Sequence, residues 1–132
     1  MTPRILIVED EMLVAMEMEA ILQDLGYECA GIAPDLISAT AFFDENLDLA
    51  LVDLNLRDGL TGPQIGAQLS GRGVPVVFIT ANPAQLGDGV AGTIGVVTKP
   101  TDADTLAAVL DFVFGSRAGK ATTAPPRLRL FG

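Results

Sequence analysis

Acidic, hydroxyl and ammonium groups follow directly after short apolar runs at four places in the 132-residue sequence. The residues at these places are Glu9, Asp10, Asp53, Thr80 and Lys99. In open α/β sheets ligands bind beyond the carboxyl ends of the strands, so side chains that follow neighbouring strands meet at one edge of the sheet. Two carboxylates about 5 Å apart repel each other by roughly 3 kcal/mol at an effective dielectric constant of about 20, so a cluster of them needs a cation. Mg²⁺ fits because it takes one or two protein carboxylates and keeps positions open for a phosphate.

Lys99 is the only lysine of residues 1–114, and it falls at this same edge. As a point charge on a flexible stem, its side chain can reach a phosphoryl oxygen or hold Asp53 when no phosphate is present. The Thr80 hydroxyl can donate a hydrogen bond to the same phosphoryl group. Acids after a first strand also fit a plain helix N-terminus. Their combination with Asp53 and Lys99 favours a phosphoryl-binding site instead.

The composition excludes several other chemistries. With 0 His and 1 Cys, the chain cannot build a Ser-His-Asp triad, a His-ligated zinc site or an internal disulfide. The formal net charge of −9 argues against nucleic-acid binding, which needs a basic face. No apolar run approaches the roughly 18 residues of a membrane span, and acidic residues interrupt the N-terminus too early for a signal peptide. We therefore expect a cytoplasmic protein with no nucleic-acid and no membrane partner.

The apolar runs that carry these residues are continuous rather than alternating, which is typical of parallel strands covered on both faces. Four of them span residues 5–8, 49–52, 74–79 and 94–97, and a weaker strand is expected at 28–33. Helix-length segments occupy residues 11–25, 35–46, 61–72 and 102–114. This alternation predicts right-handed βαβ units in an α/β fold. The expected architecture is a doubly wound, five-stranded parallel sheet with helices on both faces.

Residues 82–92 stand where the fourth of five helices would lie, and their sequence NPAQLGDGVAG opposes a long helix. Gly87, Gly89 and Gly92 each cost about 1 kcal/mol relative to alanine inside a helix. We expect this fourth helix to be short or disordered.

The charge of the chain changes sign near Gly115. All 17 acidic residues lie in residues 1–114, whereas residues 115–132 carry basic residues and no acid. The last stretch, GSRAGKATTAPPRLRLFG, is rich in small residues and contains two adjacent prolines. The sequence therefore predicts a folded domain at residues 1–114 and a flexible basic tail at residues 115–132.

The order and spacing of the motifs resemble a response-regulator receiver domain over residues 3–114. The motifs are the acidic pair Glu9-Asp10, Asp53 in LVDLNLRDGLTG, Thr80 in VVFITA, and Lys99-Pro100 in VVTKP. The resemblance implies a CheY-like fold with strand order 2-1-3-4-5. It also implies a single-domain response regulator of a two-component system or phosphorelay. Its Asp53 would be phosphorylated by a sensor histidine kinase or a histidine phosphotransfer protein.

The resemblance further implies a Mg²⁺ site around the phosphorylated aspartate. Its ligands would be Glu9, Asp10, Asp53 and the backbone carbonyl of Asn55. Asp53 would attack the phosphorus in line, while the surrounding positive charges neutralise the equatorial oxygens. A chain without histidine can perform this step because the histidine belongs to the partner. We therefore expect a protein that accepts a phosphoryl group and catalyses its own dephosphorylation, not a conventional enzyme.

Further residues receive roles from the same resemblance. Thr80 and Lys99 would bind the phosphoryl group and act as the switch. A cis peptide bond is expected before Pro100. Asn55 and Asn82 flank the site and would position the water that hydrolyses the acyl phosphate.

One departure from the receiver pattern concerns the switch. Receivers commonly carry Tyr or Phe three residues before the lysine, and this sequence has Val96 there. Together with the Gly-rich residues 81–92, this feature resembles the FAT GUY receivers of bacterial general stress signalling, although FITAN stands where that subgroup has FATGY. We therefore expect signalling through ordering of residues 81–92 around phosphorylated Asp53, with Thr80 as the link.

Two other function classes fit parts of the sequence. A scaffold or inhibitor would bind a kinase regardless of phosphorylation. A flavodoxin-type protein would bind a cofactor at the same sheet edge, but the acidic groups there repel an anion and no phosphate-cradling loop is present. The sequence does not name the downstream partner, and it leaves a homodimer open.

Overall fold

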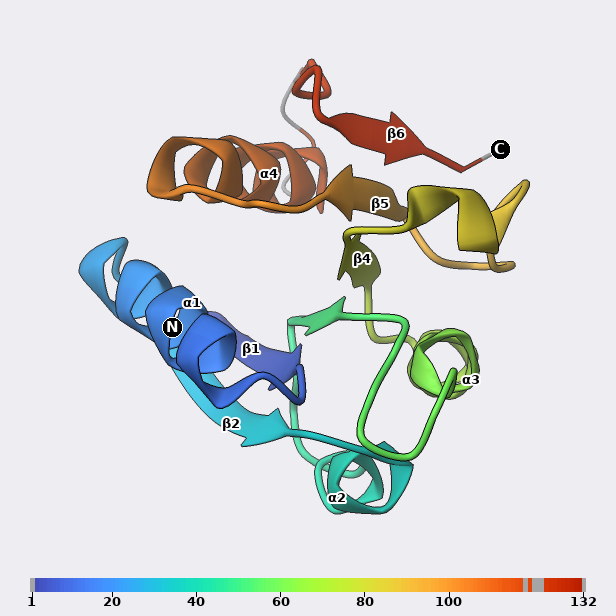
Figure 1. Ribbon diagram of the computed structural model, residues 1–132. Coiled ribbons are helices and arrows are strands. Elements are labelled where there is room, and N and C mark those ends of the chain that lie inside the picture. Colours follow the sequence, from blue (N-terminus) through green and yellow to red (C-terminus); the bar gives the residue numbers. More distant parts are fainter. Residues whose placement is uncertain (1, 118, 120–122, 132) are drawn as a thin grey trace.

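The computed structural model describes residues 2–117, 119 and 123–131, which form one six-stranded sheet with helices on both faces (Figure 1). The strands are β1 (Arg4–Val8), β2 (Glu28–Ala33), β3 (Leu49–Val52), β4 (Val76–Thr80), β5 (Gly95–Thr98) and β6 (Leu128–Leu130). The helices are α1 (Met12–Asp24), α2 (Leu36–Thr40), α3 (Gly62–Gly71), the 3₁₀ helix η1 (Pro83–Leu86) and α4 (Ala103–Arg117). The sheet order is β2-β1-β3-β4-β5-β6. The first five strands are parallel, which confirms the predicted α/β fold and strand order.

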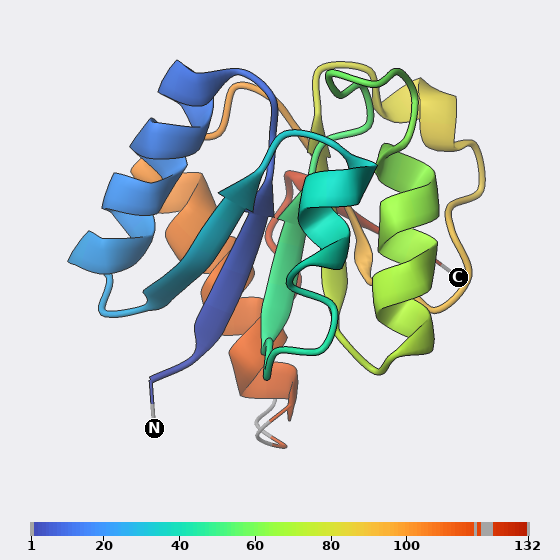
Figure 2. The same ribbon diagram turned by 90° about the horizontal axis from the view of Figure 1, so that it is seen from below.

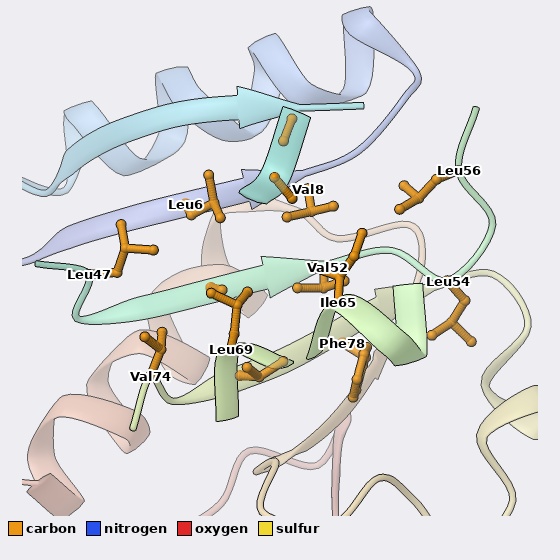
Figure 3. Packing of buried hydrophobic residues seen from close by; sticks show 14 of the residues in the cluster. Leu6, Val8, Leu47, Val52, Leu54, Leu56, Ile65, Leu69, Val74 and Phe78 are labelled. Atoms are coloured by element: carbon orange, nitrogen blue, oxygen red, sulfur yellow. The ribbon is translucent and has the colours of Figure 1, made fainter. Parts of the chain in front are cut away.

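The two faces of the sheet carry separate hydrophobic clusters. Helices α1 and α4 cover one face, and α2, α3 and η1 cover the other (Figures 1 and 2). Alternate residues of a strand point to opposite faces, so Ile5 and Ile7 of β1 pack toward α1 and α4. Leu6 and Val8 pack toward α2 and α3, among the side chains of Figure 3. This double burial is the reason for the continuous apolar runs in the sequence.

Helix α3 packs directly on the segment that follows β3. A Cβ atom at Gly62 would lie 2.0 Å from the backbone oxygen of Asp53 and 2.5 Å from the Cα of Leu54. Only glycine permits this approach, and the Gly62 amide also donates to the Leu54 carbonyl oxygen at 3.0 Å. Gly62 was not among the predicted site residues, although it fixes the backbone on which Asp53 stands.

Two helical segments are short. Helix α2 was predicted over residues 35–46 but ends at Thr40, because the next residues form tight turns with amide-to-carbonyl bonds such as Phe42 to Ala39 and Glu45 to Phe42. The expected short fourth helix is the four-residue η1. None of the described helices combines the length and apolar character that a bilayer-spanning segment requires.

The structure differs from the prediction of a flexible tail at residues 115–132. Helix α4 continues to Arg117, and Leu128–Leu130 form β6 antiparallel to β5. The physical reason is a short pattern of apolar residues that pack on opposite faces of the sheet: Leu128, which is 5% exposed, joins the cluster under α1 and α4, and Phe131 packs on the other cluster. The high content of basic, small and proline residues hid this pattern. Residues 118, 120–122 and 132 lie outside the described residues.

Candidate functional site

The ends of β1 and β3 place two carboxylates side by side. Glu9 follows β1, and its amide donates to the Ala33 carbonyl oxygen of β2 at 3.0 Å. Asp53 follows β3, and its amide donates to the Val8 carbonyl oxygen at 2.9 Å. These bonds continue the parallel ladder for one residue beyond the strands, so the backbone holds both carboxylates rigidly. Glu9 is 2% exposed and Asp53 is 8% exposed.

Lys99 bridges these two carboxylates. Its Nζ donates to Glu9 Oε1 at 2.5 Å and to Asp53 Oδ2 at 2.8 Å. The Lys99 amide donates to the Thr80 carbonyl oxygen at 2.9 Å, which anchors the residue to the end of β4. The peptide bond between Lys99 and Pro100 is cis. The carboxyl ends of β1, β3 and β5 thus deliver one ammonium group and two carboxylates to one point, across β4, which lies between β3 and β5.

Burial and charge shift the protonation of this group. Burial raises the pKa of the Glu9 carboxyl above its ordinary value; the hydrogen bond from Lys99 opposes this only in part, and the Asp53 charge adds to it. Burial of Lys99 works to lower the pKa of its ammonium, but the hydrogen bonds to Asp53 and Glu9 outweigh it, so this pKa is raised. One ammonium therefore faces two carboxylates in a poorly hydrated place, and the site has room for more positive charge.

Asp10 completes a set of three carboxylates that can bind a cation. One carboxylate oxygen from each of Glu9, Asp10 and Asp53 lies within 4.8 Å of the other two. Asp10 is the most exposed of the three. The second oxygen of Asp53, Oδ1, accepts the Leu54 amide at 2.7 Å, which fixes the orientation of this carboxylate. Because the donors are all hard oxygens and one of them faces solvent, the group fits a partly hydrated Mg²⁺ ion.

The remaining predicted residues surround this cluster. Thr80 is 1% exposed at the end of β4, and its hydroxyl oxygen accepts the Asn82 amide at 3.1 Å. Asn55 and Asn82 are both exposed. The Asn55 side chain donates to Gln85 Oε1 at 3.0 Å, so the loop after β3 is joined to η1. Gln85 was not among the predicted residues, because nothing in the sequence indicates that residues 55 and 85 meet.

The comparisons with known proteins agree with this geometry. The model of the response regulator receiver domain family matches residues 5–111. The phyllosphere-induced regulator PhyR of Methylorubrum extorquens is 40% identical over 86 residues, which cover 63% of this chain and 32% of that protein. The chain spans less than half the length of the curated relatives it matches.

Solved structures show the same relationship. The receiver domain of PhyR from Erythrobacter litoralis is 34% identical, with a TM-score of 0.76 over 86% of this chain and 90% of that chain. A structure of PhyR described as a stress response regulator is 32% identical, with a TM-score of 0.70 over 89% of this chain and 47% of that chain.

The acidic triad of Glu9, Asp10 and Asp53 is typical of the Mg²⁺ site of receiver domains and is consistent with a phosphorylated aspartate. A receiver domain works in two-component signal transduction and is not a conventional enzyme. The family match over most of the chain, a shared fold and the acidic cluster all lead to one conclusion: this chain belongs to the response regulator receiver domain family.

Proposed function

We propose that this protein accepts a phosphoryl group on Asp53 from a phosphohistidine of a sensor kinase or a histidine phosphotransfer protein, in the cytoplasm and with Mg²⁺ bound. The observation that carries the proposal is the contact of Lys99 Nζ with both Glu9 and Asp53 at the carboxyl end of the sheet. This arrangement holds the aspartate oriented and partly neutralised before any phosphate arrives. The chain has no histidine, so the phosphohistidine must lie outside these 132 residues.

The transfer is an in-line displacement at phosphorus. A carboxylate oxygen of Asp53 forms a new P–O bond while the P–N bond to the donor imidazole breaks, and the imidazole leaves with the electron pair of that bond. Lys99 then pairs with a phosphoryl oxygen, and the buried Thr80 hydroxyl turns to donate to another. Glu9, Asp10, Asp53 and the backbone carbonyl of Asn55 would hold a Mg²⁺ ion, which would further neutralise the phosphoryl charge when bound. Catalysis consists of positioning and charge neutralisation.

The surface beside the acidic triad suits a protein donor. Met12, Leu13 and Met16 of α1 are 54%, 84% and 53% exposed, which is unusual for large apolar side chains. A pocket of about 380 Å³, lined by Val14, Glu17 and Met18 of α1, reaches Lys99 and Pro100. A phosphohistidine-bearing helix that packs on this surface would bring its imidazole to Asp53.

Loss of the phosphoryl group requires a water molecule in line with the P–O bond. Asn55 and Asn82 flank the site on its exposed side and are proposed to position this water. The hydrogen bond between Asn55 and Gln85 restrains the Asn55 side chain, so Gln85 is expected to influence the lifetime of the phosphorylated form.

The output is proposed to come from residues 81–92 rather than from an aromatic switch. Position 96 is a valine, 1% exposed, and only the four-residue η1 stands in place of a long fourth helix. The chain is similar to PhyR, and one solved PhyR structure is described as that of a stress response regulator. This similarity supports a relationship to the FAT GUY stress receivers. On this proposal, the protein signals by binding another protein or by passing the phosphoryl group on in a phosphorelay.

Binding of beryllofluoride with Mg²⁺ tests the proposal directly. The expected result is a 1:1 complex of the full chain, seen by ¹⁹F NMR, that is lost in Asp53→Asn. The matched control is Asp24→Asn, which changes an exposed aspartate at the far end of α1 and should bind like the wild type. Absence of binding in the wild type would contradict the proposal and leave a scaffold or inhibitor that binds a kinase regardless of phosphorylation.

A further inference from the structure

Residues 127–131, here named the strap, cover the open edge of β5. Leu128, Arg129 and Leu130 stand opposite Val97, Val96 and Gly95 in antiparallel register. The Phe131 amide extends this pairing and donates to the Ile94 carbonyl oxygen at 3.0 Å. Figure 1 shows the strap, in red, alongside β5. The chain thereby occupies with its own end a sheet edge that would otherwise expose unpaired backbone groups.

The strap also contacts both loops that carry the phosphoryl-binding residues. The Arg129 guanidinium donates to the carbonyl oxygens of Gly87 and Pro83, at 3.2 and 3.4 Å, in the loop that follows Thr80. The Arg127 guanidinium donates to the Pro100 carbonyl oxygen at 3.1 Å, in the loop that follows Lys99. A pocket of about 480 Å³ lies between these contacts and β5. The strap is therefore joined to both segments that follow Thr80 and Lys99.

The body of the protein is shaped to receive this strand. A Cβ atom at Gly95 would lie 2.4 Å from the Arg129 backbone oxygen, so the glycine admits the strap backbone at close range. The Phe131 ring lies 6.4 Å from the Phe78 ring and packs on the cluster that includes Val96 and Leu86. With a valine at position 96, the tail supplies the aromatic ring on this side of β5.

We propose that the β5 edge and the loop at residues 83–92 form a strand-docking site, that the strap is its resident occupant, and that phosphorylation of Asp53 weakens this docking. The inference rests on the proposed function, because it takes Asp53 as the phosphorylated residue. Release of the strap exposes the edge of β5 and the apolar surface that the Phe131 side chain covers. This surface suits an extended partner segment in which basic and apolar residues alternate and an aromatic residue follows, the chemistry that the strap itself presents.

The coupling follows a chain of contacts from Thr80. In the structure, the Thr80 hydroxyl oxygen accepts the Asn82 amide. When the hydroxyl turns to a phosphoryl oxygen, Asn82 loses this partner at the start of η1. The next residue, Pro83, carries one of the carbonyl oxygens that hold Arg129. Phosphorylation thus loosens the segment on which the strap is anchored.

The strap is also held weakly enough to be released. It pairs with β5 over only three residues, and Leu128 is its one side chain that is almost fully buried. Short edge segments with few buried side chains open at a small fraction of the free energy of global unfolding. Loss of one or two contacts therefore changes the docked fraction measurably.

The test is amide hydrogen exchange of the full chain by NMR, with and without beryllofluoride and Mg²⁺. The Phe131 amide reports docking because it donates to β5. We expect its exchange rate to rise about ten-fold in the complex, while core amides of β1 and β3 are unchanged. Unchanged or slower exchange at Phe131 in a protein that does bind beryllofluoride would overturn the inference and leave the proposed function intact. Failure to bind beryllofluoride would overturn both, and the ¹⁹F signal distinguishes the two results.

Two variants test the coupling in the reverse direction: they weaken docking of the strap, and the affinity for beryllofluoride is measured. Gly95→Ala places a methyl group against the Arg129 oxygen and should open the strap in the free protein; Arg129→Ala removes the contacts to Pro83 and Gly87 at an exposed side chain. Because coupling between two equilibria is reciprocal, each variant should bind beryllofluoride several-fold more tightly. The control Gly71→Ala has open space around its Cβ and should match the wild type. Faster Phe131 exchange with unaltered beryllofluoride affinity would refute the coupling.

Discussion

The two ends of the sheet each hold one cation between two carboxylates, and they differ in burial. At the carboxyl end, Lys99 contacts Glu9 and Asp53, and the three side chains are 17%, 2% and 10% exposed. At the amino end, Arg4 contacts Glu28 and Glu45 at 2.7 and 2.9 Å, and these side chains are 32%, 55% and 39% exposed. The formal charges and the distances are nearly the same. Water hydrates and screens the amino-end group, whereas the carboxyl-end group depends on its own members for compensation.

This difference separates a surface contact from a site. Each carboxylate at the amino end remains hydrated if Arg4 turns away. At the carboxyl end, loss of Lys99 leaves two carboxylates uncompensated in a poorly hydrated place, so that end gains most from an added cation. Burial, rather than the number of charges, should therefore decide how the two ends respond to substitution, Mg²⁺, pH and salt.

The largest contrast between the two ends of the sheet is expected when the positively charged side chains of Lys99 and Arg4 are removed. Lys99→Ala should lower the free energy of unfolding by about 2 kcal/mol, below the roughly 3–5 kcal/mol found when a fully buried pair is broken, because this site is partly open to solvent. Arg4→Ala should lower the free energy of unfolding by much less. Urea denaturation of both variants at neutral pH measures the difference. Equal costs would mean that burial does not decide how strongly these ion pairs stabilise the protein.

Mg²⁺ should stabilise the folded protein by binding at the carboxyl end of the sheet and not at the amino end. At ten times its dissociation constant, a ligand that binds only the folded state adds about 1.4 kcal/mol to the free energy of unfolding. Asp10→Asn should abolish this gain, because Asp10 supplies the exposed oxygen of the triad. Glu45→Gln, at the amino end, is the matched control and should retain it. Stabilisation by Mg²⁺ that survives in Asp10→Asn would place the ion elsewhere.

Glu9 and Asp35 should contribute with opposite signs to the pH dependence of the free energy of unfolding. The pKa of Glu9 is raised in the folded protein, so the folded state holds this proton more tightly, and stability from this group falls as pH rises from about 4.5 through the folded pKa. The pKa of Asp35 is lowered to about 2, chiefly by hydrogen bonds from Ser38 and also by Arg57. Its stabilisation is present above pH 3.8 and is lost as pH falls toward 2.

Urea denaturation across this pH range, with Glu9→Gln and Asp35→Asn, separates the two contributions. Glu9→Gln should remove the decline above pH 4.5, and Asp35→Asn should flatten the loss below pH 4. A steeper decline above pH 4.5 in Glu9→Gln would contradict the assigned direction of the Glu9 shift.

The smallest expected effect is the response to salt. In about 1 M NaCl the Debye length falls to about 3 Å, so exposed ion pairs are largely screened and buried ones are not. The cost of Arg4→Ala should then vanish, whereas most of the cost of Lys99→Ala should remain. Repeating the urea titrations at low and high salt measures both. A Lys99→Ala cost that disappears in high salt would show that water reaches the carboxyl-end group freely.

The sequence allowed the prediction of residues that follow strand ends, but not of contacts between distant loops. Asp53, Thr80 and Lys99 could be placed at one edge because parallel strands end together, and the structure does bring Lys99 to Glu9 and Asp53. The bond between Asn55 and Gln85 and the packing of Gly62 on Asp53 depend on how the loops and α3 fold over the sheet. No periodicity encodes such contacts.

The end of the chain shows the same limit. Its composition indicated a flexible tail, yet Leu128–Leu130 pair with β5. Three residues are too few for a strand signal, and their pairing depends on the open β5 edge and on Gly95, which lies far away in sequence. Helix α2 likewise ends early because Phe42, Phe43 and Leu47 turn inward to cover the sheet.

The sequence by itself determined the α/β alternation, the strand order implied by its family and the set of charged residues at the carboxyl edge. These features depend on local patterns and on the geometry shared by all parallel sheets. Only the tertiary structure decided which charges lose their water, which loops meet and where the last residues dock. Desolvation and long-range packing depend on every neighbour in space, and residues distant in the chain supply those neighbours.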